Sequence, residues 1–321
     1  MDHEPVLADK VVELLLPALE HGGVFVDATL GRAGHARAIL EAAPNSTLVG
    51  IDRDPIALEA SRTDLEAFGE RVRLARDNFS QLASVLERLG IASARGVLLD
   101  LGVSSPQLDE PGRGFSFRQP GPLDMRMDPL RPLSAHDVVN GYAEPDLTRV
   151  IQRYGEERFA RRIARAIVRA RPIEGTTALA EIVKGAIPAA ARRTGGHPAR
   201  RTFQAIRIEV NDELGNLEAV LPEVVDVLEP GGRAVVLSYH SLEDRIVKRF
   251  FNDAAAGCVC PPGFPVCTCG AEARVRVLTR RPIKPTAEDI EANPRASAAK
   301  LRAVERLAPS ARVPLEERRS A

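Results

Sequence analysis

The chain has 321 residues, of which 44% are hydrophobic and 27% charged, enough to bury the core of one large domain or two ordinary ones. Its formal net charge is zero, and no apolar run approaches the ~18 residues of a membrane-spanning helix, so no membrane partner is expected. The opening MDHEPVLADK carries acids and no basic leader, so we expect no secretory signal and a cytoplasmic protein.

Four short apolar segments of the first third each reach an aspartate. VFVDA, LVGID, VRLARD and GVLLD place acids at Asp27, Asp52, Asp77 and Asp100, and helical patterns cover residues 33–43, 54–67 and 79–89 between them. Apolar strands that alternate with helices predict a doubly wound α/β sheet of parallel strands. Because ligands bind beyond the carboxyl ends of such strands, the four acids should line one site.

The alternation stops after Asp100, and the next clear strand is GGRAVVLSY at 231–239. The connection is too long for a loop, so it predicts an inserted all-helical domain over 109–208. The sheet domain then comprises 1–108 and 209–306, and 307–321 form a flexible tail. Near the end, RVRVLTR (274–280) predicts an added strand and SAAKLRAVERL (297–307) an amphipathic helix.

The inserted segment is strongly basic. Residues 149–207 hold 14 Lys and Arg and four acids, a net charge of +10. In one helix over 147–171, apolar residues could line one face (Ile151, Tyr154, Ile163, Ile167, Ala170) and arginines another (Arg158, Arg162, Arg165, Arg169). This favours a polyanion-binding surface, with a solvated helix face as the alternative. His197, Arg200 and Arg201, where the insert rejoins the sheet, are candidates to hold phosphates.

A glycine-containing turn, DATLGRAGHA at 27–36, joins the first strand to the first helix. It matches neither the dinucleotide fingerprint nor the P-loop. Asp52 can accept hydrogen bonds from ribose hydroxyls, and Asp77 and Phe79 can flank an adenine. An acid for ribose without a pyrophosphate loop favours S-adenosylmethionine over NAD. The alternative for each acid is a helix N-cap, a role that suits Asp54 before Pro55.

An ordered set of motifs adds a family resemblance. HEPVL, DATLGRAGH, GIDRDP, LLDLGVSSPQLD, GFSF with GPLDMRMD, YGEERFARRIARAIV, HPARRTFQAIRIEVN and SYHSLEDRIVK follow one another from residue 3 to about 306. Together they resemble the bacterial 16S ribosomal RNA cytosine-N4 methyltransferase family, MraW or RsmH.

The resemblance implies a class I (Rossmann-like) S-adenosylmethionine-dependent methyltransferase with an inserted substrate-recognition domain. Its substrate would be 16S ribosomal RNA in the small subunit, methylated at the N4 amine of a decoding-centre cytidine (position 1402); the oligomeric state, including a homodimer, stays open. By the family pattern the cofactor would be bound by Ala33, Gly34, His35, Asp52, Phe79, Asp100 and Gln107. The family pattern has glycine where this chain has Ala33.

Amine methylation explains why an apolar strand ends in LLDLGVSSPQLD. The cytosine amine is a poor nucleophile, and acceptors such as Asp100, Ser104 and Ser105 can hold its N–H groups while the methyl donor lies in line. Asp100 is the expected proton acceptor, and no metal is required. Phe115, Phe117 and Tyr239 could stack on an extruded base, with core packing as the alternative. His240 and Ser241 could face the target, or SLED could form a capping box.

All four cysteines lie in CVCPPGFPVCTCG: Cys258, Cys260, Cys267 and Cys269. A zinc knuckle, reduced thiols and redox-sensitive pairing are all compatible with this spacing, and we expect no metal in the chemistry itself. Two other functions compete with methyl transfer. A NAD(P)-linked enzyme predicts a pyrophosphate fingerprint that is missing, and a non-catalytic RNA-binding factor leaves the four strand-end acids unexplained.

Overall fold

The computed structural model describes residues 5–193, 196–256 and 272–309, and these divide into two compact units. The sheet unit comprises residues 1–52, 56–101 and 217–321, and the helical unit comprises 53–55 and 102–216. The four cysteines lie outside the described residues. Within the described part of the chain, every helix is too short or too polar to cross a lipid bilayer.

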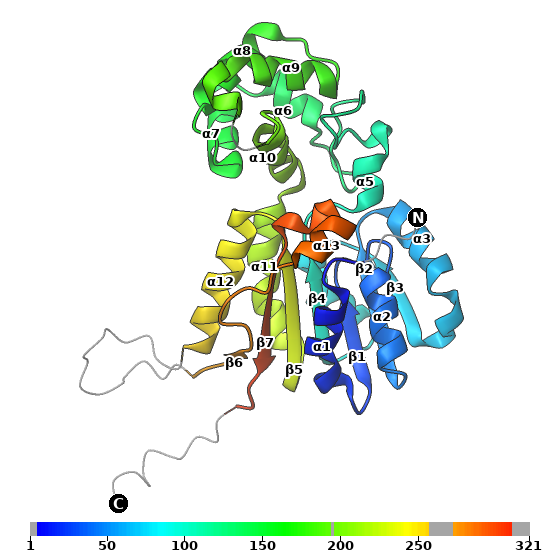
Figure 1. The fold of residues 1–321 in the computed structure, drawn as a ribbon. Helices are drawn as coiled ribbons and strands as arrows, with labels where there is room; N and C mark the ends of the chain where they lie inside the picture. The colour runs from blue at the N-terminus through cyan, green and yellow to red at the C-terminus, as the bar shows by residue number, and fades with distance from the viewer. Residues whose placement is uncertain (1–4, 194–195, 257–271, 310–321) are drawn as a thin grey trace, which may run out of the picture. The chain divides into compact units, whose positions relative to one another are not determined.

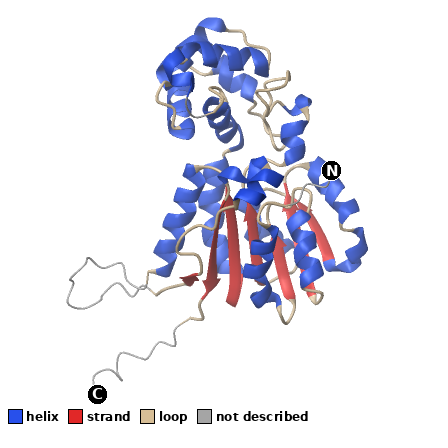
Figure 2. Cartoon of the chain, viewed as in Figure 1, coloured by secondary structure: helices blue, strands red, loops and turns tan. Residues whose placement is uncertain are grey.

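A seven-stranded sheet forms the centre of the sheet unit (Figures 1 and 2). Its order is β3-β2-β1-β4-β5-β7-β6, with β1–β5 parallel and β7 antiparallel to both neighbours. The strands are β1 Gly23–Asp27, β2 Ser46–Asp52, β3 Val72–Arg76, β4 Ala94–Asp100, β5 Leu228–Ser238, β6 Val275–Val277 and β7 Lys300–Arg306. This confirms the expected doubly wound α/β fold.

Helices cover both faces of this sheet because its strands are apolar on both sides. Phe25 of β1 packs with α1 (Ala8–Leu19), α2 (Gly34–Ala42) and α3 (Pro55–Asp64), whereas the next residue, Val26, packs with α4 (Leu82–Arg88), α11 (Glu213–Val227) and α12 (Ser241–Ala255). Short 3₁₀ segments precede β3 (Glu66–Arg71) and α4 (Phe79–Gln81). The helices expected over 33–43, 54–67 and 79–89 are thereby confirmed.

The strand order reverses between β1 and β4, which are parallel neighbours. Crossovers leave these two strands toward opposite sides, and such a switch point opens a crevice at the carboxyl ends of the strands. Asp27 ends β1 and Asp100 ends β4, so two of the expected acids stand at this point.

The helix expected over 297–307 is wrong, because residues 300–306 form β7 between β5 and β6. Leu301 and Ala303 face one hydrophobic cluster of the sheet unit, and Val304 the other. Arg302 is also buried and pairs with Asp244 of α12 at 2.7 Å. A buried, ion-paired arginine hid the strand pattern. The strand expected earlier in the chain, over 274–280, is present but shorter, and α13 (Ala287–Ala292) and a 3₁₀ segment (Pro294–Ala298) lie between it and β7.

The helical unit has its own hydrophobic core. Its elements are α5 Ser105–Asp109, a 3₁₀ segment Pro111–Arg113, α6 Ala135–Gly141, α7 Glu144–Gly155, α8 Ala160–Ala170, α9 Thr176–Ala186, a 3₁₀ segment Ala189–Arg193, α10 Arg200–Asn211 and the start of α11. Buried Asn211 links this core to the segment after α5, since its side chain accepts from Met127 N and donates to Met125 O.

The single helix expected over 147–171 is wrong, because the segment forms α7 and α8. The break follows Gly155, where a Cβ would lie 2.8 Å from the Arg201 carbonyl oxygen, and Glu156 adopts a left-handed conformation (φ 46°). Ile151, Ile163 and Ile167 are fully buried, but Ala170 is exposed. The four arginines of the expected stripe are all exposed: Arg158, Arg162, Arg165 and Arg169.

Candidate active site

Asp100 is the most heavily contacted carboxylate at the switch point. Its backbone N–H donates to Thr29 Oγ1 at 2.6 Å, and the Tyr239 hydroxyl donates to its Oδ1 at 2.8 Å. His35 Nδ1 lies 3.6 Å from its Oδ2. About a quarter of the Asp100 side chain (26%) remains exposed. Thr29 therefore holds the backbone of Asp100, and Tyr239 and His35 contact its carboxylate, while part of the side chain stays accessible to a ligand.

This environment raises the pKa values of both Asp100 and Tyr239. Burial raises the pKa of Asp100, the nearby His35 ring and the Tyr239 hydrogen bond lower it in part, and the charge of Glu243 raises it. Burial and the charge of Asp100 together raise the pKa of Tyr239 well above its usual value. Tyr239 thus stays protonated and is a permanent hydrogen-bond donor to Asp100.

The hydrogen bonds of His35 define which ring nitrogen carries its proton. The side chain is buried, and its Nε2 lies 2.9 Å from the carbonyl oxygen of Val6. Because a carbonyl only accepts, Nε2 carries a proton. A neutral His35 therefore turns an unprotonated Nδ1 toward Asp100, and a charged His35 forms an ion pair with it.

The turn after β1 and the start of α2 carry three of the expected cofactor residues, Ala33, Gly34 and His35. Gly31 N donates to Asp52 Oδ2 at 2.8 Å, which fixes the half-buried carboxylate at the end of β2. Ala33 is buried with φ 57°, a left-handed conformation that favours glycine, which is the residue of the family pattern. At Gly34 a Cβ would lie 2.5 Å from Pro5 Cγ, so this position requires glycine.

Asp27 is a second unusual acid at the same edge. Its side chain is 2% exposed, and Thr29 N donates to its Oδ1 at 3.2 Å. Burial raises the pKa of Asp27 to about 8, the Thr29 hydrogen bond opposes this, and the charges of Asp100 and Asp52 add to it. Folded Asp27 is therefore protonated at neutral pH.

A protonated Asp27 predicts a pH-dependent stability that Asp27→Asn should remove. The folded pKa is about 8 and the ordinary value is 3.8, so between these values the folded state holds a proton that the unfolded state lacks. The free energy of unfolding should then fall by about 1.3 kcal/mol per pH unit from pH 5 to pH 7, and less steeply as the pH approaches 8. Urea unfolding of both proteins measures this; equal pH slopes would contradict a neutral Asp27.

Asp77 and Phe79, which follow β3, were expected to flank an adenine. Asp77 accepts from Asn78 N at 2.8 Å and pairs with Arg88 of α4 at 2.7 Å. Phe79 is half-buried and packs against the core beneath it. Both side chains therefore have structural contacts of their own, and the adenine role stays a prediction.

The remaining expected residues belong to the helical unit. Ser104 precedes α5 and donates its N–H to Gln107 Oε1 at 3.1 Å. Gln107 is buried and donates to Asp54 Oδ2, which also accepts from Arg113. The Ser105 side chain lies outside the part of the chain that the structure describes. The Gln107 amide and the Asp54 carboxylate thus form one buried polar network, and the roles of Ser104, Ser105 and Gln107 stay predictions.

The three candidate stacking rings have different surroundings. Phe115 is 5% exposed in the core of the helical unit, and Phe117 is half-buried. Tyr239 follows β5 and contacts Asp100 through its hydroxyl, as described above. Sequence reasoning considered only its ring and missed this hydrogen bond.

The capping box expected within SLED is shifted by one residue. His240, not Ser241, is the N-cap of α12, and Glu243 is its reciprocal partner. Glu243 Oε2 accepts from the backbone N–H groups of Tyr239 and His240 at 2.8 and 3.2 Å. This cap fixes the backbone that carries the Tyr239 ring, so Glu243 and Thr29 are supporting residues that the sequence reading missed.

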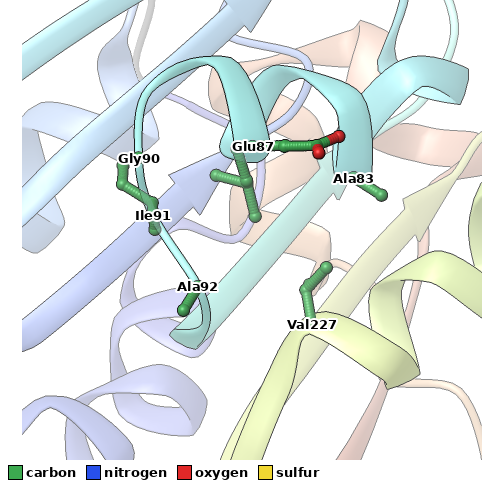
Figure 3. Close-up of a pocket in the computed structure, with 7 residues that line it drawn as sticks. Ala83, Glu87, Gly90, Ile91, Ala92 and Val227 are labelled. Carbon is green, nitrogen blue, oxygen red and sulfur yellow. The ribbon is translucent and has the colours of Figure 1, made fainter.

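A separate apolar pocket lies beside α4 (Figure 3). Its lining residues are Ala83, Leu86, Glu87, Gly90, Ile91, Ala92 and Val227. They come from α4, the segment leading into the start of β4, and the end of α11. The pocket is therefore at the amino end of β4, opposite to the edge that carries Asp100.

Comparison with known proteins identifies the family. Residues 1–307 match the MraW methylase family. The ribosomal RNA small subunit methyltransferase H of Geobacter sulfurreducens is 55% identical over 309 residues, covering 95% of this chain and 99% of that protein. The protein of the same name from Acidothermus cellulolyticus is 54% identical over 309 residues, covering 95% and 94%. Among solved structures, SMU.1697c from Streptococcus mutans in complex with SAH aligns over 96% of this chain and 100% of its own, with 13% identity and a TM-score of 0.44. The family match spans nearly the whole sequence, and the chain belongs to the MraW methylase family.

Proposed function

We propose that this chain transfers a methyl group from S-adenosylmethionine to the N4 amine of a decoding-centre cytidine in 16S ribosomal RNA. Membership of a methylase family and close relatives named for the small ribosomal subunit support the coarser part, a methyltransferase of small-subunit ribosomal RNA. The observation that carries the amine mechanism is Asp100, a partly exposed carboxylate with a raised pKa at the switch point of the sheet.

The residues at this edge fit S-adenosylmethionine by their chemistry. Asp52 offers carboxylate oxygens for ribose hydroxyls, and the turn from Gly31 to Gly34 brings backbone close to a ligand. The carboxylates at the ends of β2 and β4, Asp52 and Asp100, favour a cationic sulfonium over an anionic pyrophosphate. When bound, the cofactor supplies an electrophilic methyl group. The NAD-linked alternative lacks both the fingerprint and a surrounding that favours phosphate.

Asp100 and the residues that hold it can make the N4 amine of cytosine, a poor nucleophile, more reactive. Its lone pair is delocalised into the ring, and a carboxylate that accepts an N–H hydrogen bond increases the electron density on nitrogen. Tyr239 and Thr29 hold Asp100 in place for this task. The raised pKa of Asp100 brings its basicity closer to neutral pH, which suits a group that takes the amine proton after methyl transfer.

The arginines of α8 are the proposed contacts to the RNA backbone. Arg162 and Arg169 are exposed seven residues apart, two helical turns, so they lie on one face. Arg165 is also exposed but pairs with Glu144 at 3.5 Å. Their side chains can approach phosphates without unfolding, since Ile163 and Ile167 anchor the opposite face in the core.

Reversing charge at Arg162 and Arg169 should weaken RNA binding selectively. We expect the double glutamate variant to bind 16S RNA about 10-fold more weakly near 0.1 M salt, with a salt slope reduced by about 2. Affinity for S-adenosylmethionine should not change. Filter binding across a salt series measures the first, and calorimetry the second. The same reversal at exposed Lys248 and Arg249 of α12 is the matched control; an equal effect there would assign the loss to net charge alone.

The proposed reaction is tested with small subunits from a strain that lacks the family's gene. The subunits are incubated with the chain and methyl-labelled S-adenosylmethionine, and the RNA is digested to nucleosides. Label in N4-methylcytidine from the decoding region is the expected result. Label on a ring carbon or a 2′-oxygen would overturn the amine mechanism, and an unlabelled subunit would overturn the RNA substrate.

A further inference from the structure

Three aromatic rings contact one another in a row that leads from the core of the helical unit to its surface. Phe203 of α10 is 4% exposed, and the Phe117 ring meets it edge-on with centroids 5.7 Å apart. His197 lies on Phe117 with centroids 4.5 Å apart and an interplanar angle of 14°. Because His197 is exposed, the stack ends in a ring available to solvent.

The outer ring is held in a defined orientation. His197 Nδ1 lies 3.2 Å from the backbone N of Ala199, whose N–H donates to it. Nδ1 is therefore an acceptor, and the proton of the neutral ring is on Nε2. A ring that is stacked beneath and hydrogen-bonded at one edge loses little further freedom when a ligand covers it, so it is preorganised for stacking.

Exposed arginines lie beside Phe117 and close to His197 in the sequence. Exposed Arg118 places its guanidinium 5.9 Å from the Phe117 centroid, and Arg200, three residues after His197, is exposed as well. Arg201 already has a partner within the protein, since its Nη1 donates to the Glu156 carbonyl oxygen at 3.3 Å. A flat ring with nearby cations matches a nucleotide, whose base stacks while its phosphates pair with arginine.

We propose that the exposed face of His197 is a stacking platform for one unpaired nucleobase of the RNA substrate, with Arg118 and Arg200 on the flanking phosphates. The platform deepens the proposed function and rests on it, because it names how the helical unit recognises single-stranded RNA. It also gives Phe117 a role that differs from core packing: this ring supports the platform from beneath.

The platform is tested with a single fluorescent reporter. The chain has no tryptophan, so His197→Trp introduces one indole at the top of the stack. Protein-free 16S RNA should quench its emission, because a base stacks on the indole. Inorganic polyphosphate, which offers charge without bases, should leave the emission unchanged. His136→Trp on α6, another exposed histidine position of the same unit, is the matched control and should respond weakly to both.

Affinity provides the second readout. His197→Ala should raise the Kd for 16S RNA about 10-fold, the effect of losing one stacked base, while His197→Phe should bind within about 2-fold of wild type. Unquenched His197→Trp at saturating RNA, quenching by polyphosphate, or an unchanged Kd for His197→Ala would overturn the platform. Wild-type methylation of the subunits is run in parallel. If it proceeds while the His197 readouts fail, only the platform is wrong; if it fails, the proposed function is wrong.

Discussion

Replacing Asp100 by asparagine is expected to reduce the rate of methyl transfer about 10²- to 10⁴-fold, the usual worth of a positioned acid or base. Asparagine keeps the size of the side chain and an oxygen that can accept from Tyr239, so the fold should be retained. It loses the negative charge that polarises the amine and the site that takes its proton. Single-turnover methylation of small subunits at saturating cofactor measures the chemical step, and circular dichroism checks folding.

Tyr239→Phe is the informative companion, because it leaves the carboxylate in place. The Tyr239 hydrogen bond lowers the pKa of Asp100, so its removal raises that pKa further. Ionised Asp100 is present above its pKa and lost as pH falls through it. The acid limb of the rate profile should therefore move to higher pH in Tyr239→Phe and vanish in Asp100→Asn. An unchanged profile in both variants would remove Asp100 from the chemistry.

Asp52→Ala should weaken the affinity for S-adenosylmethionine about 10- to 100-fold, because hydrogen bonds from ribose hydroxyls to a carboxylate would be lost. Part of the loss would come from the turn, where Gly31 N loses its acceptor. Calorimetry with S-adenosylmethionine and S-adenosylhomocysteine measures the change. Both ligands share the ribose, so both should lose affinity to the same extent.

A nearby acid separates this effect from general charge. Asp64, at the end of α3, pairs with Arg32 at the surface at 3.3 Å. Asp64→Ala changes the net charge by the same amount and should leave cofactor affinity within about 2-fold. Equal losses in the two variants, or none in Asp52→Ala, would show that Asp52 does not hold the ribose.

The acids at the edge of the sheet could be predicted from the sequence because each strand end depends on a few neighbouring residues. An apolar run ending in an acid and followed by a glycine turn predicts a strand end, and parallel strands bring those ends together. Asp27, Asp52 and Asp100 could be placed on this basis. β7 could not, because its alternation includes Arg302, whose burial depends on an ion pair with Asp244 far away in the sequence.

The contacts around Asp100 could not be predicted from the sequence for the same reason. Tyr239 and His35 reach Asp100 from distant parts of the chain, and only the packed sheet brings them within range. Likewise, no periodicity shows that His197 lies on Phe117. From residue type alone, the Tyr239 ring was expected to stack on a base or pack in the core, whereas the structure shows that its hydroxyl donates to Asp100.

The pairing of β4 with β5 has a consequence for how the protein is made. The two strands are neighbours in the sheet, yet residues 101–227 separate them in the chain. On a translating ribosome, β4 therefore emerges long before its partner, and its hydrogen-bonding edge stays open while the whole helical unit is synthesised. Until β5 is synthesised, the unpaired edge of β4 can pair with other chains. We therefore expect a chaperone that binds the nascent chain to protect it most during this interval.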